Sequence, residues 1–164
     1  VKDSILLTIV GDLLTDADFG LLYRRLRTEL GVIYGVSASL SGLPGMPFVC
    51  EANMNNRNMA LLEDEYRAAL RRVVSGTYSA ELLETVLNQY RKLLICEAEQ
   101  APLFGCLSSL EESWLTGKEE DVNSLEVIDS ANHDSLAEIA AKYLLNQPTA
   151  TLKVLTGESE DEDS

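Results

Sequence analysis

The sequence of 164 residues lacks most of what membrane spans, metal sites and nucleic-acid surfaces require. Its longest apolar stretch, from Ile5 to Val10, contains Thr8 and is far shorter than the roughly 20 residues of a transmembrane helix. It contains one histidine, His133, so a zinc site built from several histidines is excluded. Lys and Arg number 13 against 27 Asp and Glu, giving a formal net charge of −14. This acidity argues against nucleic acid as a partner, because such surfaces need clustered basic residues.

Motifs for catalysis are equally scarce. The three cysteines, Cys50, Cys96 and Cys106, are odd in number and form no CxxC pair, so we expect reduced, buried thiols, although Cys96 and Cys106 could pair across two helices. There is no GxSxG and no phosphate-binding GxxxxGK[ST] loop. His133 lies where a helix is expected to begin, and an exposed structural role is its simplest interpretation. We therefore predict no catalytic residue and no metal ligand in this chain. With neither a span nor a visible signal peptide, we expect a soluble protein, and its compartment stays open.

The spacing of apolar residues predicts helices over most of the chain. They are expected over 5–14, 19–30, 62–73, 83–94 and 103–114, and from Asn132 or Ser135 to Leu144, with a short helix or turn at 124–129. Asp16 or Asp18, then Ser79, then Asn132 or Ser135 are candidate caps for helix starts. The segment from Ser135 to Glu138 fits a capping box. Alternating apolar residues predict strands at 32–40, 48–54 and 150–155.

This order of elements predicts one α+β domain over residues 1–157. We expect an antiparallel-rich sheet of three or more strands, covered by helices on one face. Three strands are few for a stable sheet, so we expect a further strand, either before Val1 or from another chain. Residues 158–164 hold five acids and no apolar anchor, and are expected to form a flexible acidic tail.

One segment, residues 22–39, combines chemistry with a change of secondary structure. A basic helix carrying Arg27 ends at Gly31, where a left-handed residue is favoured, and a strand carrying Tyr34 follows. The guanidinium and the phenol are both hydrogen-bond donors, and two such donors beside a cleft can hold a peptide carbonyl or an oxyanion. The alternative is that Tyr34 is a half-buried strand aromatic and that Arg27 pairs with an acid such as Glu29.

The pattern Arg27-x-x-x-Gly31-x-x-Tyr34, followed by Val36-Ser-Ala-Ser39, resembles the zinc-free half-domain of the pitrilysin family. This family of inverzincin metallopeptidases includes insulin-degrading enzyme and the mitochondrial processing peptidase. The resemblance implies a metallopeptidase-like half-domain that pairs with a second, similar domain around a peptide. It implies zinc on a His-x-x-Glu-His helix of that second domain, and Arg27 and Tyr34 as residues that reach the substrate. The helix expected at 5–14 contains no His and no Glu, as in the zinc-free half.

The resulting expectation is the substrate-binding, catalytically inactive half of a zinc metalloendopeptidase that degrades or processes peptides. Its partners would be a peptide or unfolded polypeptide substrate and a zinc-bearing catalytic domain or subunit. Whether the chain works within an active enzyme stays open at this point. The alternatives are a structural or assembly subunit of the same fold and an unrelated acidic protein-interaction domain.

Overall fold

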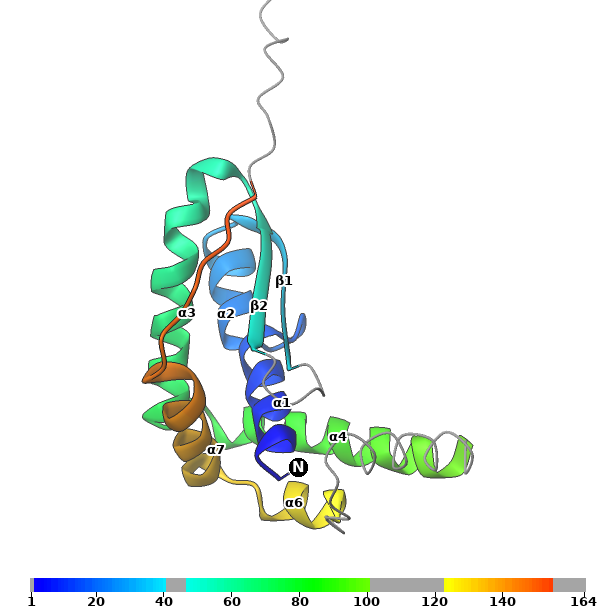
Figure 1. The fold of residues 1–164 in the computed structure, drawn as a ribbon. Helices are drawn as coiled ribbons and strands as arrows, with labels where there is room; N and C mark the ends of the chain where they lie inside the picture. The colour runs from blue at the N-terminus through cyan, green and yellow to red at the C-terminus, as the bar shows by residue number, and fades with distance from the viewer. Residues whose placement is uncertain (1, 41–46, 101–122, 155–164) are drawn as a thin grey trace, which may run out of the picture.

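The computed structural model describes residues 2–40, 47–100 and 123–154, and for residues 95–100 it describes the backbone alone. The elements, coloured along the chain in Figure 1, are α1 (Lys2–Thr15), α2 (Leu21–Tyr23), the π-helical turn η1 (Arg24–Glu29), β1 (Ile33–Leu40), β2 (Phe48–Met54), the 3₁₀ turn η2 (Asn56–Asn58), α3 (Met59–Val74), α4 (Ala80–Gln100), α6 (Ser124–Ser130), α7 (His133–Ala140) and the π-helical turn η3 (Ala141–Leu145). The described residues therefore form an α+β domain of six α-helices and one two-stranded antiparallel sheet.

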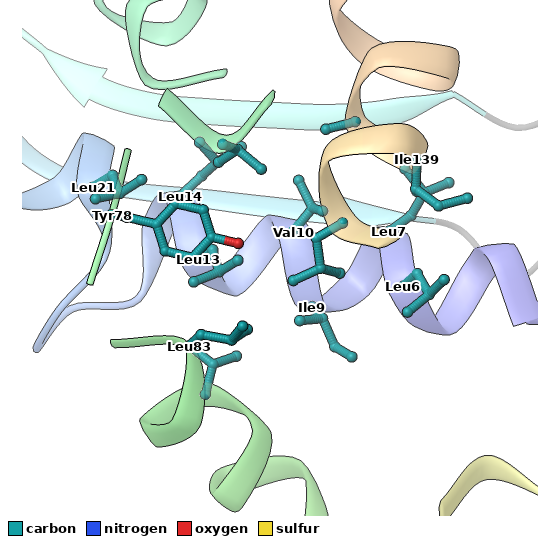
Figure 2. Packing of buried hydrophobic residues seen from close by; sticks show 14 of the residues in the cluster. Leu6, Leu7, Ile9, Val10, Leu13, Leu14, Leu21, Tyr78, Leu83 and Ile139 are labelled. Atoms are coloured by element: carbon teal, nitrogen blue, oxygen red, sulfur yellow. The ribbon is translucent and has the colours of Figure 1, made fainter. Parts of the chain in front are cut away.

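Helix α1 is the centre of the core. Its apolar residues are spread around most of its circumference, and it contacts β1 and the helices α2, α3, α4, α6 and α7. Leu13 is fully buried, at 0% exposure. Figure 2 shows its leucines, isoleucine and valine meeting Leu21, Tyr78, Leu83 and Ile139 from four other parts of the chain. A helix that is apolar on nearly all sides is expected to be buried, and this one is.

The sheet lies against α1 on one face. β1 and β2 pair in register from Gly35 opposite Asn53 to Leu40 opposite Phe48. Val36 and Ala38 are half-buried, whereas Ser37 and Ser39 are exposed, so the two faces of β1 differ. At Gly11 of α1 a side chain would stand 3.5–3.6 Å from Ala38 and Phe48, which shows how closely the helix approaches the sheet.

Most predicted elements in the described ranges are confirmed. The helices at 5–14, 62–73, 83–94 and 124–129 and the strand at 48–54 lie where the periodicity placed them. The helix expected at 19–30 begins at Leu21 and changes to π-helical hydrogen bonding at Arg24. Ser79 caps α4, since its hydroxyl accepts a hydrogen bond from the Leu82 amide at 3.1 Å.

The strand expected at 150–155 is wrong in its described part. Residues 151–154 form no strand, and Leu152 and Val154 are 89% and 75% exposed. After η3 the chain instead runs back along α3 (Figure 1), where Arg67 donates to the Thr149 hydroxyl at 2.9 Å. The alternation of apolar residues is present, but no strand within the described residues pairs with this segment. The predicted sheet of three or more strands is thus reduced to two within these residues.

The cap expected from Asp16 or Asp18 and the capping box expected at Ser135–Glu138 are wrong, whereas Asn132 is confirmed as the cap of the last helix. Gly20 precedes α2 without a side-chain cap, and Asp16 instead accepts from the Asp18 amide at 2.8 Å within the preceding turn. At α7 the capping box is formed by Asn132 with Ser135, one turn earlier than the box expected from Ser135. An Asn in this position accepts from the third residue of the helix as effectively as Ser does.

His133 is less exposed than predicted. Its ring stacks on that of Tyr78, with centroids 4.5 Å apart, and its Nε2 lies 3.3 Å from the Tyr78 carbonyl oxygen. The single histidine is therefore half-buried at the joint between α7 and the start of α4, rather than on the open surface. Burial raises the pKa of the Tyr78 phenol to about 12.

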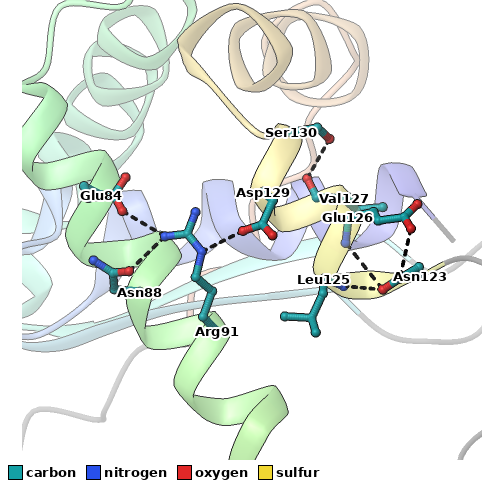
Figure 3. Close-up of polar contacts among 9 residues, drawn as sticks. All are labelled: Glu84, Asn88, Arg91, Asn123, Leu125, Glu126, Val127, Asp129 and Ser130. Carbon is teal, nitrogen blue, oxygen red and sulfur yellow. Dashed lines mark hydrogen bonds and ion pairs between the residues drawn. The ribbon is translucent and has the colours of Figure 1, made fainter.

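Polar contacts join α4 to α6 at the surface. Figure 3 shows Arg91 of α4 between Glu84 and Asp129, with N–O distances of 2.8 Å to each carboxylate. Asn123 caps α6 by accepting from the Leu125 and Glu126 amides. The helix predicted at 103–114, the side chains of Cys96 and Cys106, and the acidic tail lie outside the described residues.

Candidate functional site

The turn between η1 and β1 brings the two predicted site residues to one place. We call residues 27–35 the corner. Gly31 adopts a φ of 65°, a conformation that costs glycine little, and the Val32 amide donates to the Leu26 carbonyl oxygen at 2.9 Å. The chain thereby reverses over four residues, so that the end of the helix and the start of the strand are neighbours although Arg27 and Tyr34 are seven positions apart.

Arg27 is held at the corner by the backbone. Its Nη1 donates to the carbonyl oxygen of Ile33 at 2.8 Å, directly before Tyr34 in the chain. The alternative pairing with Glu29 is not found, because Glu29 accepts from Arg25 at 2.8 Å, and Arg25 also contacts Glu65. These two carboxylates raise the pKa of Arg25. Within the described residues Arg27 forms no ion pair, so most of its five N–H donors are available to a ligand.

Tyr34 projects outward because the strand pairing slips at this residue. Ile33 lies opposite Met54 and Gly35 lies opposite Asn53, which leaves Tyr34 as the extra residue of a β-bulge. Ile33 is buried as a result, and Tyr34 is 72% exposed. Simple alternation grouped Tyr34 with Val36, Ala38 and Leu40 on one face, and the slip overturns that grouping. The alternative of a half-buried strand aromatic is therefore wrong.

The corner thus carries two exposed hydrogen-bond donors of different geometry: the Arg27 guanidinium, which contacts the backbone directly before Tyr34, and the Tyr34 phenol. The Tyr34 hydroxyl makes no hydrogen bond within the described residues, and the remaining Arg27 donors are likewise unengaged there. A planar guanidinium suits a carbonyl or carboxylate oxygen, and a phenol can donate to the same kind of acceptor. Sequence reasoning missed the Ile33 carbonyl as the partner of Arg27, because a backbone acceptor leaves no signal in a side-chain pattern.

A separate shallow hollow of about 220 Å³ lies between η1 and α3. Its lining consists of Leu21, Arg25, Glu29, Glu65, Ala68, Ala69 and Arg72, and includes neither Arg27 nor Tyr34. Four of these seven residues are charged, and Arg25 is already held by the carboxylates of Glu29 and Glu65.

The described residues offer no zinc site. No group of three or more His, Cys, Asp or Glu side chains gathers there. On α1 the buried positions are Leu, Ile, Val, Gly and Thr. Its partly buried acids, Asp3 and Asp12, are both engaged: Asp12 accepts from the Tyr90 hydroxyl at 2.7 Å, and Asp3 accepts from the Tyr143 hydroxyl at 2.7 Å. Cys50 is half-buried on β2, where burial and then Glu51 raise the pKa of its thiol to about 11, so it is protonated near pH 7. These described side chains do not fit a zinc ion.

Two solved structures share this fold. One is a conserved protein from Enterococcus faecalis V583, with a TM-score of 0.73 and 12% identity over 85% of this chain. The other is a protease from Helicobacter pylori, with a TM-score of 0.73 and 15% identity over 87% of this chain. The chain spans about a third of each, 33% and 35% respectively. No curated protein matches.

The described residues form an α+β domain whose fold is shared with a solved protease structure, and they contain no cluster of metal ligands. Residues 1–90, more than half of the chain, match the family model "Peptidase M16 inactive domain", and the chain belongs to this family. The resemblance to the zinc-free pitrilysin half-domain is confirmed, and an unrelated interaction domain is excluded. Among the described helices, none has the length and apolar character needed to cross a membrane.

Proposed function

We propose that this chain is the substrate-binding, catalytically inactive half of a zinc metalloendopeptidase that degrades or processes peptides. The observation that carries the proposal is the corner, where Arg27 and Tyr34 are exposed with donors unengaged within the described residues. Membership of the inactive-domain family supports it, since such a domain works beside a catalytic one. The zinc ion and its chemistry would belong to that catalytic domain, on the same polypeptide or on another subunit.

Arg27 and Tyr34 each have a role suited to the chemistry of their side chains. The Arg27 guanidinium, oriented by its bond to the Ile33 carbonyl, donates to a main-chain carbonyl of the substrate. The Tyr34 hydroxyl donates to the same peptide, either in the ground state or as negative charge develops on the carbonyl oxygen. The net charge of −14 would favour basic peptides during approach.

The test compares variants in the assembled enzyme, with the catalytic half present. Tyr34→Phe removes one hydroxyl from an exposed side chain, and Arg27→Lys removes the guanidinium fork while keeping the charge. We expect kcat/KM for a peptide substrate to fall about tenfold or more in each, the loss of one good donor, with kcat affected more than peptide affinity. Arg24→Ala, at an exposed arginine on the same turn of helix, is the matched control and keeps its activity.

One observation favours a second candidate, a structural or assembly subunit of the same fold. The bond from Arg27 to Ile33 closes the corner, and this alone would give Arg27 a structural purpose. Tyr34 has no such bond within the described residues, so Tyr34→Phe separates the two candidates. Normal peptidase turnover in both Tyr34→Phe and Arg27→Lys would contradict the substrate-binding role and favour the structural one.

A further inference from the structure

Gly35 occupies a position where the fold does not require glycine. It lies within β1, directly after Tyr34, and pairs in register with Asn53 of β2. Glycine weakens a strand, since it adds backbone entropy and no side chain to pack. A glycine in such a place therefore needs a reason, and the structure allows the ordinary reasons to be checked.

A special backbone conformation is not the reason. The glycines with positive φ in the described residues are Gly31 and Gly76, and Gly35 is not among them. The β-bulge does not demand glycine either, because its extra residue is Tyr34.

Close packing is not the reason either. A Cβ placed on Gly35 would have no atom within 4 Å, apart from its chain neighbours. At Gly20, by contrast, a Cβ would stand 2.5 Å from the Asp16 amide nitrogen, so the fold itself requires glycine there. The space at Gly35 is open, and the side chain of its chain neighbour Tyr34 is exposed.

A close approach by another main chain is the remaining physical reason for glycine in a strand. Strand alternation places Gly35 on the outward face, with the exposed residues Ser37 and Asn53, opposite to the face that packs on α1. Resting on the function proposed above, we infer that Gly35 is a third substrate-contacting position of the corner. Its missing side chain leaves room for the main chain of an extended peptide to cross β1 beside Tyr34, within reach of both donors. Recognition of this kind contacts the peptide backbone and does not depend on the side chains of the substrate.

The experiment adds bulk at this position in the assembled enzyme. Because the space is open and φ is ordinary, Gly35→Ala and Gly35→Val should fold, with unfolding midpoints equal to or above that of the parent. We expect kcat/KM for the peptide to fall about fivefold or more with Ala and further with Val, mainly through KM. Ser39→Val adds similar bulk to the same face of β1, four residues from Gly35, and should leave kcat/KM unchanged.

The outcomes separate this inference from the proposed function. If Tyr34→Phe and Arg27→Lys impair turnover while Gly35→Ala and Gly35→Val do not, the inference about Gly35 is overturned and the proposed function stands. An equal loss in Ser39→Val would also overturn it, because the effect would then not be local. A fall in the unfolding midpoint of Gly35→Ala would assign the glycine a structural role instead. If all variants keep normal turnover, the proposed function fails and this inference fails with it.

Discussion

The surroundings of α1 and the corner at residues 27–35 use neighbouring parts of the chain in opposite ways. Around α1, leucine, isoleucine and valine side chains from most of the described helices exclude solvent, and Leu13 is fully buried. At the corner, Tyr34 and Arg27 are exposed. Apart from the Arg27 bond to the Ile33 carbonyl, their donors are unengaged within the described residues. The buried side chains around α1 stabilise the fold, whereas the exposed residues of the corner carry hydrogen-bond donors and bury little surface.

The difference also shows how a half-domain without metal ligands can be organised. Within the described residues, α1 is packed mainly with apolar side chains, and its acid Asp12 is bonded to Tyr90 of α4. The polar groups that could meet a ligand lie at the edge of the sheet instead. If this division is correct, changes around α1 should alter stability, and changes at the corner should alter peptide use.

The largest expected effect comes from a cavity beside α1. Leu13→Ala should lower the free energy of unfolding by about 3–5 kcal/mol, because a fully buried leucine is replaced and the neighbours close the space only in part. Urea denaturation followed by circular dichroism measures the loss. Tyr34→Ala is the comparison at the corner, and it should change stability by less than about 0.5 kcal/mol, as exposed positions do. Similar losses in both variants would break the division between the two regions.

A smaller effect concerns the pH dependence of the Asp12 contact. Burial raises the pKa of Asp12 above its usual 3.8, although the Tyr90 hydroxyl opposes this. The folded state therefore holds a proton more tightly than the unfolded state, and the stability from this group is complete below about pH 3.8 and lost as pH rises through the folded pKa. Asp12→Asn keeps an acceptor for Tyr90 but cannot ionise.

We therefore expect Asp12→Asn to gain stability relative to the parent as pH rises from 3.5 to 7. Denaturation curves of both proteins at these two pH values give the difference in their stability directly. Effects of pH on other groups are shared by both proteins and cancel in this difference. Peptide turnover should not respond, since Asp12 lies in the α1 region. A stability difference independent of pH would contradict the raised pKa.

The smallest effect is expected at the exposed ion pairs between α4 and α6. Arg91→Ala removes contacts to Glu84 and Asp129 and should cost about 0.5–1 kcal/mol at low salt, less at 1 M salt. Thermal unfolding at both salt concentrations measures it. This site is polar and at the surface, as the corner is, yet its arginine is fully paired. Loss of peptide turnover in Arg91→Ala without loss of stability would show that exposed polar residues outside the corner also serve function.

Much of the local structure was predictable from the sequence. Apolar spacing located α1, α3, α4 and α6, and alternation located the β-hairpin, with the Phe48–Met54 strand correct at both ends. The pairing of Arg27 with Tyr34 as candidate site residues also came from the sequence, through spacing around Gly31 and a resemblance to a family that the comparison confirms. Their role in binding substrate stays a prediction.

Other features could not be read in this way. Residues 150–154 alternate like a strand, but a strand also needs a neighbour to accept its backbone hydrogen bonds, and the described chain provides none. His133 looked like a surface residue, because nothing near it in sequence reveals that Tyr78, 55 positions earlier, stacks on its ring.

The sequence by itself determined the apolar character of α1, the turn at Gly31 and the presence of two donors on either side of that turn. These follow from residue type and short-range spacing, which act within one helix or one turn. Only the tertiary structure decided that Tyr34 points outward, that Arg27 binds the Ile33 carbonyl and that a side chain at Gly35 would meet open space. Each of these depends on how β1 registers against β2 and where the chain returns, and such long-range geometry is set by packing rather than by local pattern.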